Sequence, residues 1–511
     1  MAANLRQAAR TKTLPAPLGG WNTRDSLALM ESTDAVTLDN WWPRTSDMIN
    51  RRGSSVWATG ISGAVNTLMT YSIPTGQAMF AAASDKIYNV STQGAVGAPV
   101  VTGLGSAVFE YTNINTAGGS FLYAVNGVDN ALLYNGTTWT GITAVSTPAI
   151  TGVATTQFKQ VNLWKRRLFF VQKESMSVWY LPVNSVGGAA SEINFGSLFK
   201  KGGKIVATAT WTVDAGYGAD DNLVIITNRG EIAVYNGIDP ANATTFNLIG
   251  VFELGSPVSD RCYVKYAGDL LIITLDGIVP LSKALSSTRV DNRVAISDKI
   301  SGAMTDATTL YQYNFGWEGI LFPKVNMLLF NVPVTANEES QQFVMNTLTG
   351  AWARFKNWNA NTFELFNDDL YFGSAGTVYK GWDGYDDVGT NIVSEVKQAF
   401  NYFDAPAQLK HWKMARPIFF ANRPPPFQIN LDIDFDDQPI YSYPTTDIST
   451  LALWDVSLWD NSIWSGQTIY KYWQSLAKIG YCAALRMVVT GNGLDLTWPS
   501  TDFLYEYGGV L

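Results

Sequence analysis

The stretch NLVIITNRGEIAVYNG, residues 222–237, holds the local pattern on which the fold prediction rests. An apolar run leads into Asn228-Arg229-Gly230, and a second run follows that ends in an aromatic residue. Asn and Gly tolerate the positive φ angles that tight turns require, so the pattern predicts a β-hairpin. Six similar stretches begin at Met79, Phe121, Arg167, Asp269, Met327 and Asp369.

This recurrence predicts the architecture of the middle of the chain. Starts some 40 to 60 residues apart are typical of a β-propeller, in which each sheet packs on its neighbours in a ring. We expect about seven blades over residues 61–389, with six or eight still open, and a pair of β-sandwiches is the alternative. Residues 1–60 are expected to form an extended N-terminal arm, and residues 390–511 a separate C-terminal β-domain resembling a sandwich.

Composition supports an all-β fold and excludes several other classes. Of the 511 residues, 15% are charged and 13% aromatic, and 44 are glycine, which suits short strands and tight turns. The net charge of −8 argues against a protein that coats nucleic acid through a basic face. Cys262 and Cys482 give no disulfide framework. We expect a soluble protein made in the cytoplasm, without a signal peptide or a membrane span.

The arm carries an unusual density of tryptophan. Residues 18–60 read LGGWNTRDSLALMESTDAVTLDNWWPRTSDMINRRGSSVWATG and include Trp21, Trp41, Trp42 and Trp57. Rings of this size need a surface to bury against, so we expect the arm to lie across another domain or a neighbouring subunit. Trp21, Trp41 and Trp42, with Arg51-Arg52 at the end of the segment, are therefore interface candidates. On this hypothesis, replacing Trp41 and Trp42 by Ala blocks assembly and leaves a folded monomer.

These motifs also carry a family resemblance. The Gly-Gly-Trp-Asn opening, the Leu-Asp-Asn-Trp-Trp-Pro centre and the Arg-Arg-Gly end resemble the start of tail nozzle proteins of short-tailed bacteriophages. These are also called tail tubular proteins B, or packaged-DNA stabilisation (tail hub) proteins. LWDVSLWDNSIWSG at 453–466 and WPSTDFLYEYGG at 498–509 resemble the end of that family.

The resemblance implies a non-enzymatic structural protein of the virion without a cofactor. It implies a homohexameric tube that extends the portal and adaptor channel, retains packaged double-stranded DNA and conducts it during ejection. Its expected partners are further copies of itself, the head-tail adaptor and the tail fibres or spikes. By that analogy a mildly acidic lumen would let DNA slide.

Two further clusters are candidates for contacts with partners. Trp454, Trp459 and Trp464 recur every five residues, a spacing that fits neither one helix face nor one strand face, and they predict a docking patch or a buried cluster. Asp432, Asp434 and Asp436 alternate with an apolar face running from Phe427 to Phe435. They predict a solvated strand face that could line a lumen, with a Ca²⁺ site as the alternative.

Other patterns keep rival functions open. His411 is the only histidine, so a catalytic triad could use only that residue and a multi-histidine zinc site is impossible. Asp383, Asp386 and Asp387 in GWDGYDD would suit a propeller that binds or degrades host glycans. A propeller that binds peptides as a scaffold is a third possibility. The basic clusters 51–52, 165–167, 200–204 and 410–416 could contact phosphates if a ring turned them inward.

Overall fold

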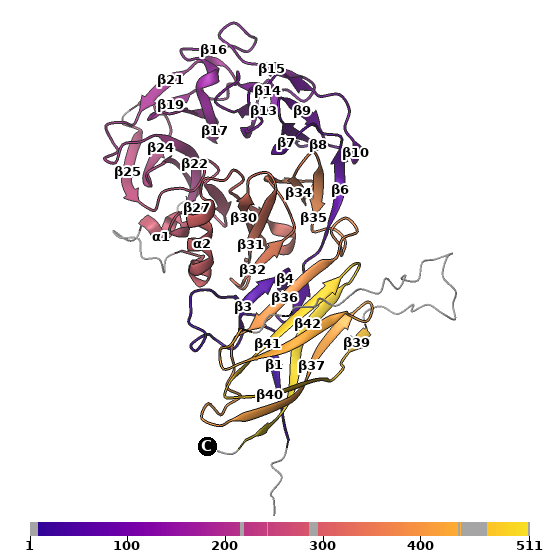
Figure 1. Ribbon diagram of the computed structural model, residues 1–511. Coiled ribbons are helices and arrows are strands. Elements are labelled where there is room, and N and C mark those ends of the chain that lie inside the picture. The colour runs from indigo at the N-terminus through magenta and orange to yellow at the C-terminus, as the bar shows by residue number, and fades with distance from the viewer. Residues whose placement is uncertain are drawn as a thin grey trace, which may run out of the picture.

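The molecule consists of a ring of β-sheets joined to a second β-rich region (Figure 1). A computed structural model describes residues 9–214, 219–242, 244–285, 295–437, 440 and 468–508. Strands dominate these residues and helices are few and short, which confirms the all-β prediction. Trp454, Trp459 and Trp464 lie outside the described residues.

The first four sheets of the ring each contain four antiparallel strands. The first sheet contains β7 (Val65–Ile73), β8 (Gly76–Ala83), β9 (Lys86–Asn89) and β11 (Val101–Thr102), and the second contains β12 (Glu110–Thr116), β13 (Gly119–Val125), β14 (Leu132–Tyr134) and β15 (Trp139–Gly141). The third contains β17 (Phe158–Trp164), β18 (Arg167–Gln172), β19 (Ser177–Tyr180) and β21 (Ser191–Asn194). The fourth contains β22 (Ile205–Asp214), β23 (Ala219–Thr227), β24 (Glu231–Gly237) and β25 (Phe246–Glu253).

Three more sheets complete the ring among the described residues. The fifth contains β26 (Tyr263–Tyr266), β27 (Asp269–Thr274) and β28 (Gly277–Pro280). The sixth contains β29 (Glu318–Phe322), β30 (Met327–Thr335), β31 (Glu339–Asn346) and β32 (Trp352–Lys356). The seventh contains β33 (Thr362–Phe366), β34 (Asp369–Gly373), β35 (Val378–Gly381) and β6 (Ser54–Thr59), which comes from the predicted arm.

Short elements connect these sheets. The strands among them are β10 (Gly94–Ala95), which pairs with β6, and the pair β16 (Ile150–Thr151) and β20 (Gly188–Ala189). The helices are η1 (Thr155–Gln157), α1 (Leu281–Leu285), η3 (Asp298–Ile300), α2 (Ser301–Tyr311) and η4 (Pro323–Val325). After β28 the chain enters α1, which is why the fifth sheet has three described strands where the others have four.

Six of the seven predicted hairpins form interior strands of a sheet, and the hairpin from Asp269 forms β27 and the edge strand β28. Several hydrophobic clusters lie between neighbouring sheets. Met69 and Phe80 of the first sheet pack with Leu122 of the second, and Trp164 of the third packs with Leu223 of the fourth. Inner strands of neighbouring sheets contact one another, among them β12 with β17, β17 with β22, β26 with β29 and β29 with β33, and β33 of the seventh sheet contacts β7 of the first. A single sheet would leave a face exposed, so the ring arrangement buries what each hairpin alone cannot.

The second region consists of two sheets around one core. One sheet has the order β39-β37-β42-β5-β4, with β1 paired to β42 and β40 paired to β37. Its strands are β1 (Arg10–Pro15), β4 (Trp41–Pro43), β5 (Met48–Asn50), β37 (Lys410–Ala421), β39 (Thr468–Tyr470), β40 (Gln474–Gly480) and β42 (Leu496–Tyr507). The facing strands are β36 (Ile392–Gln398), β38 (Phe427–Ile433) and β41 (Ala483–Gly491).

The two regions are joined by one continuous sheet. Strands β2 (Gly20–Trp21) and β3 (Asp34–Asp39) lie between β32 of the ring and β36 of the second region, giving the order β29-β30-β31-β32-β2-β3-β36-β41-β38. The predicted arm is thus distributed over the whole structure. It contributes β1, β4 and β5 to one sheet, β2 and β3 to the connection, and β6 to the ring.

Replacing Trp41 by Ala should destabilise the monomer itself. Trp41 is fully buried and its ring packs on Trp498 at a centroid distance of 5.5 Å. Removing a buried Trp side chain costs about 3–5 kcal/mol in unfolding free energy. Urea unfolding would measure this loss, and Tyr472→Ala, at a residue that is 62% exposed, is the control with a change of about 0.5 kcal/mol or less. A Trp41→Ala protein as stable as the control would contradict this role.

Candidate functional site

The tryptophans predicted to bind a partner are buried inside the chain. Trp21 packs edge-on against Phe343 of β31 at 5.3 Å, and its indole N–H donates to the Val36 carbonyl at 3.1 Å. Trp42 lies against Phe355 and Trp382. The ring and the second region supply the surface that these side chains need, so the structure shows the first of the two predicted alternatives, burial against another domain, and not the second, burial against a neighbouring subunit.

Each side chain of the Asp-Asn-Trp-Trp motif at 39–42 makes contacts that hold parts of the chain together. Asp39 accepts from Arg354 Nε at 2.6 Å and pairs with Lys356 Nζ at 2.6 Å. Asn40 adopts a φ of 57°, which Asn tolerates better than most residues. Its side chain donates to the Val393 carbonyl and accepts from the Lys356 amide.

Arg51 is completely buried where the arm, the sixth sheet and the turn after the seventh sheet meet. Its Nε donates to Asn40 Oδ1 at 2.9 Å and its Nη2 to the Lys356 carbonyl at 2.9 Å. Both terminal nitrogens also bind the Asp387 carboxylate, and Nη1 donates to the Arg52 carbonyl. The guanidinium is thus a structural centre, and the prediction of an interface at Arg51 is wrong.

The neighbouring acids take part in the same construction. The Asp387 carboxylate forms an ion pair with Arg51, and Asp383 accepts a hydrogen bond from the Ser55 hydroxyl at 2.6 Å. Asp386 accepts from the Gly389 amide within its turn. Arg52 stacks over the Tyr385 ring at 5.0 Å. These contacts give the three carboxylates of GWDGYDD positions in a structural turn, where each of them is neutralised or hydrogen-bonded.

The predicted row of lumen acids is not a solvated strand face. Strand β38 ends at Ile433, because Asp434 and Phe435 adopt positive φ angles and turn the chain. Asp432 is fully buried and pairs with Lys397 at 2.9 Å. Asp434 accepts from the Tyr481 and Cys482 amides, while Asp436 lies beyond the strand end in an exposed position. No group of acids, histidines or cysteines suited to holding a metal occurs among the described residues.

Most of the predicted basic clusters are engaged in local contacts. Lys410 is buried and donates to three backbone carbonyls, and Arg416 pairs with Asp502. Lys204 pairs with Glu174, and Arg167 with Asp239. His411 lies on β37 opposite Glu506 and Ile479.

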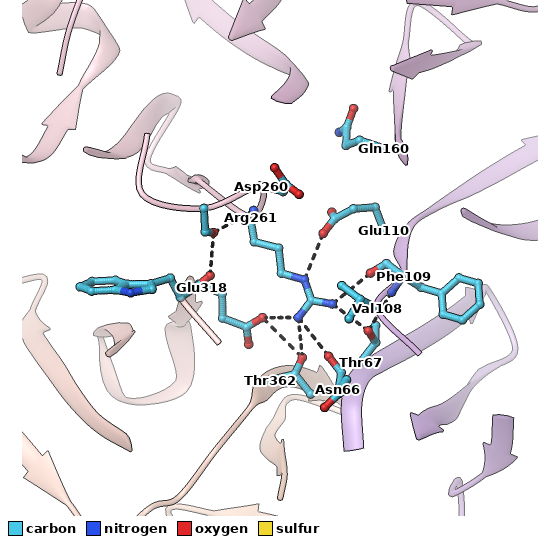
Figure 2. A network of polar contacts seen from close by, with 12 residues as sticks. Asn66, Thr67, Val108, Phe109, Glu110, Gln160, Asp260, Arg261, Glu318 and Thr362 are labelled. Carbon is cyan, nitrogen blue, oxygen red and sulfur yellow. Dashed lines mark hydrogen bonds and ion pairs between the residues drawn. The ribbon is translucent and has the colours of Figure 1, made fainter. Parts of the chain in front are cut away.

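A polar centre that the sequence did not reveal, called axial below, lies where several sheets of the ring meet (Figure 2). Arg261 precedes β26 of the fifth sheet. Its Nε donates to Glu110 Oε1 at 3.0 Å and its Nη1 to Glu318 Oε2 at 3.0 Å. Further bonds reach atoms of the first, second and seventh sheets, namely the Asn66 carbonyl, the Thr67 hydroxyl, the Phe109 carbonyl and the Thr362 hydroxyl.

One guanidinium therefore connects five of the seven sheets. It separates two cavities, and both include Arg261 and Glu110 in their walls. One has a volume of about 210 Å³ and is lined also by Glu318 and Glu364. The other has a volume of about 660 Å³ and is lined by Lys159, Asp260 and Tyr313. Nothing in a single sequence marks Arg261, because SDRC at 259–262 has no periodic or motif context.

Burial changes the acid-base properties of this centre. Desolvation raises the pKa of Glu318 to about 7, although Arg261 opposes the shift. Desolvation likewise raises the pKa of Glu364 to about 7, against the effect of the hydrogen bond from Tyr111. Burial also raises the pKa of Glu110, with Arg261 again opposing it.

Comparisons with known proteins identify similar architecture only. No protein-family model and no curated protein matches the chain. Among solved structures, the extracellular domain of a hybrid two-component system from B. thetaiotaomicron has a TM-score of 0.39 and 11% identity, covering 64% of this chain and 40% of that one.

Two further solved structures are similar over part of the chain. BBS1N in complex with ARL6DN has a TM-score of 0.28 and 14% identity, over 42% of this chain and 62% of that one. YCF48 bound to D1 peptide has a TM-score of 0.28 and 10% identity, over 65% and 95%. The chain thus spans less than two thirds of the length of the two-component system domain and of BBS1N. An assignment of function has to rest on the chain's own residues.

Replacing Arg261 by Met should destabilise the ring strongly. Above the raised pKa of Glu318, where both acids are ionised, the change leaves Glu110 and Glu318 without their counter-charge, and breaking a buried ion pair in this way costs about 3–5 kcal/mol. Thermal and urea unfolding would measure the loss, with Arg229→Met in an exposed turn as the control. Adding Glu318→Gln to the Arg261→Met variant should restore part of the stability, because it removes one uncompensated charge. Additive effects of the two substitutions would contradict the coupling.

Proposed function

We propose that this chain is a tail nozzle, or tail hub, protein of a short-tailed bacteriophage. In this proposal it is a structural protein of the virion that extends the portal and adaptor channel, retains packaged DNA and conducts it during ejection. It assembles as a homohexamer, contacts the head-tail adaptor and carries tail fibres or spikes. The proposal rests on the family resemblance of the two ends of the chain.

One observation gives that resemblance structural support. The arm motif and the C-terminal motif are separated by more than 400 residues, yet Trp498 of β42 pairs with Met48 of β5, and its ring contacts Trp41. Chance resemblance at two distant sites would not require the two motifs to share a core. Their joint burial supports the interpretation that both belong to one inherited architectural unit.

The axial centre bears on where DNA could pass. Arg261 and its partners fill the space where five sheets of the ring meet, and the cavities beside them measure about 210 and 660 Å³. A duplex whose major groove alone is about 12 Å wide has no passage there. In the proposed assembly the conduit therefore lies between copies of the chain, and the ring of each copy acts as a rigid wall or peripheral support.

The alternative of a glycan-binding or glycan-degrading propeller has less support. Two carboxylates considered for that role, Asp383 and Asp387, are bound by Ser55 and Arg51. A catalytic acid pair needs carboxylates whose environments leave one free to donate a proton and the other to act on the sugar. The positions of these groups instead fit the structural turn described above.

Mass photometry of the purified chain, alone and with the cognate portal-adaptor complex, would test the proposed function. We expect a hexamer in solution, or a monomer that binds the complex in six copies. A monomer whose mass does not respond to the complex would overturn the proposal.

A further inference from the structure

The axial cluster, defined as Glu110, Tyr111, Arg261, Glu318 and Glu364, contains more acids than bases. Three carboxylates line the cavity of about 210 Å³, and Arg261 is the one guanidinium in its wall. Glu110 and Glu318 share Arg261 as a partner. If all three acids were ionised, the cluster would carry two uncompensated negative charges in a poorly solvated space, which is costly.

Glu364 is the acid with the weakest charge compensation. Its Oε2 accepts from the Tyr111 hydroxyl, and its Oε1 accepts from the Leu365 amide at 3.0 Å. Among the described residues no lysine or arginine forms an ion pair with it. A neutral phenol and one amide compensate a half-buried carboxylate only in part, so a bound proton is the remaining route to neutrality.

Among the described residues that line the smaller cavity, Arg261 is the only cation. The fifth sheet and the segment before it contribute Asp260, Arg261, Cys262 and Tyr263 to the titratable groups that face the cluster. The other such groups are Glu110 and Tyr111 of β12, Glu318 of β29, Glu364 of β33 and Lys159 of β17. Lys159 is paired with Asp260 at 3.4 Å, on the side of the larger cavity. Both lysines in the wall of the larger cavity are thus already matched by an acid, because Lys204 pairs with Glu174.

We propose that the axial cluster is a proton-operated brace, which holds the first, second, fifth, sixth and seventh sheets together most firmly when Glu318 and Glu364 carry protons. Uptake of two protons makes the cluster neutral, since Glu110 and Arg261 balance each other. Loss of these protons places like charges on β29 and β33, which contact each other in the ring. This inference does not depend on the proposed phage function, because it concerns the ring of a single chain.

The direction of the pH effect follows from proton linkage. The two carboxyls have an ordinary pKa of 4.5 and a raised pKa of about 7 in the folded chain. The folded state therefore binds more protons than the unfolded state between these values. The stability that they contribute is fully present below their unfolded pKa and is lost as the pH rises through their folded pKa near 7.

Glu364→Gln tests the brace directly. The amide keeps an acceptor for Tyr111 or Leu365 and removes the charge at every pH. Thermal unfolding of the full chain at about pH 5.5 and about pH 8.5, on either side of the raised pKa, should show a lower Tm at the higher pH for the wild type. The variant should lose much of that decline and melt several degrees higher than the wild type at the higher pH.

The matched control is Glu338→Gln, which removes the same charge from the exposed loop between β30 and β31. It should follow the wild-type dependence of Tm on pH. Hydrogen exchange of peptides covering β12 and β33, corrected for the intrinsic effect of pH, gives a second readout within the ring. Wild-type protection should be higher at pH 6 than at pH 8, and the variant should show a smaller difference.

Two results would overturn the brace. One is a Glu364→Gln protein whose Tm changes with pH as steeply as that of the wild type. The other is wild-type exchange in β12 and β33 that shows the same corrected protection at both pH values, and this measurement needs no variant to fold.

Discussion

A buried guanidinium has to satisfy its N–H groups inside the protein, and this requirement fixes how the parts of the chain meet. Arg51 finds its acceptors on Asn40, on the Lys356 carbonyl at the end of β32 and on Asp387 after the seventh sheet. Leaving such a group unpaired costs several kcal/mol, so the arm, the sixth sheet and the seventh sheet can combine in few other ways. The Trp358 ring over the guanidinium, at 5.0 Å, excludes water from the same point.

The connection by one continuous sheet follows from this arrangement. Strands β2 and β3 are short, but they pair with β32 on one side and β36 on the other. Gly20 has a φ of 85°, and a Cβ atom there would lie 2.6 Å from the Trp352 backbone nitrogen, so only glycine allows this approach. A force applied to the second region would therefore pass into the ring through backbone hydrogen bonds. This mechanical coupling suits a protein that has to stay rigid under load, as the proposed nozzle does.

Local sequence patterns predicted the ring well and its connections poorly. Hairpin signals are local, because a turn and its two flanking runs carry all the information, and so the seven central hairpins could be located. The destination of β6 depends on β35, more than 300 residues away, and nothing in residues 54–59 specifies that partner. The tryptophans of the arm correctly indicated burial, but a single sequence does not distinguish a covering domain in the same chain from a neighbouring subunit.

The contacts of charged residues with distant segments were even harder to predict from local patterns. The alternation of Asp432, Asp434 and Asp436 with apolar residues predicted a solvated face, whereas Lys397 on β36 draws Asp432 into a buried pair and the turn at Asp434 ends the strand.

Arg261 and Arg51 are both buried cations whose contacts select one arrangement of distant segments, but the number of acids around each of them differs. Arg51 faces one carboxylate and neutral acceptors, so its charge is matched one to one, whereas Arg261 faces more acid than it can neutralise. The protein thus combines a permanent joint between its regions with an axial joint whose strength depends on protons.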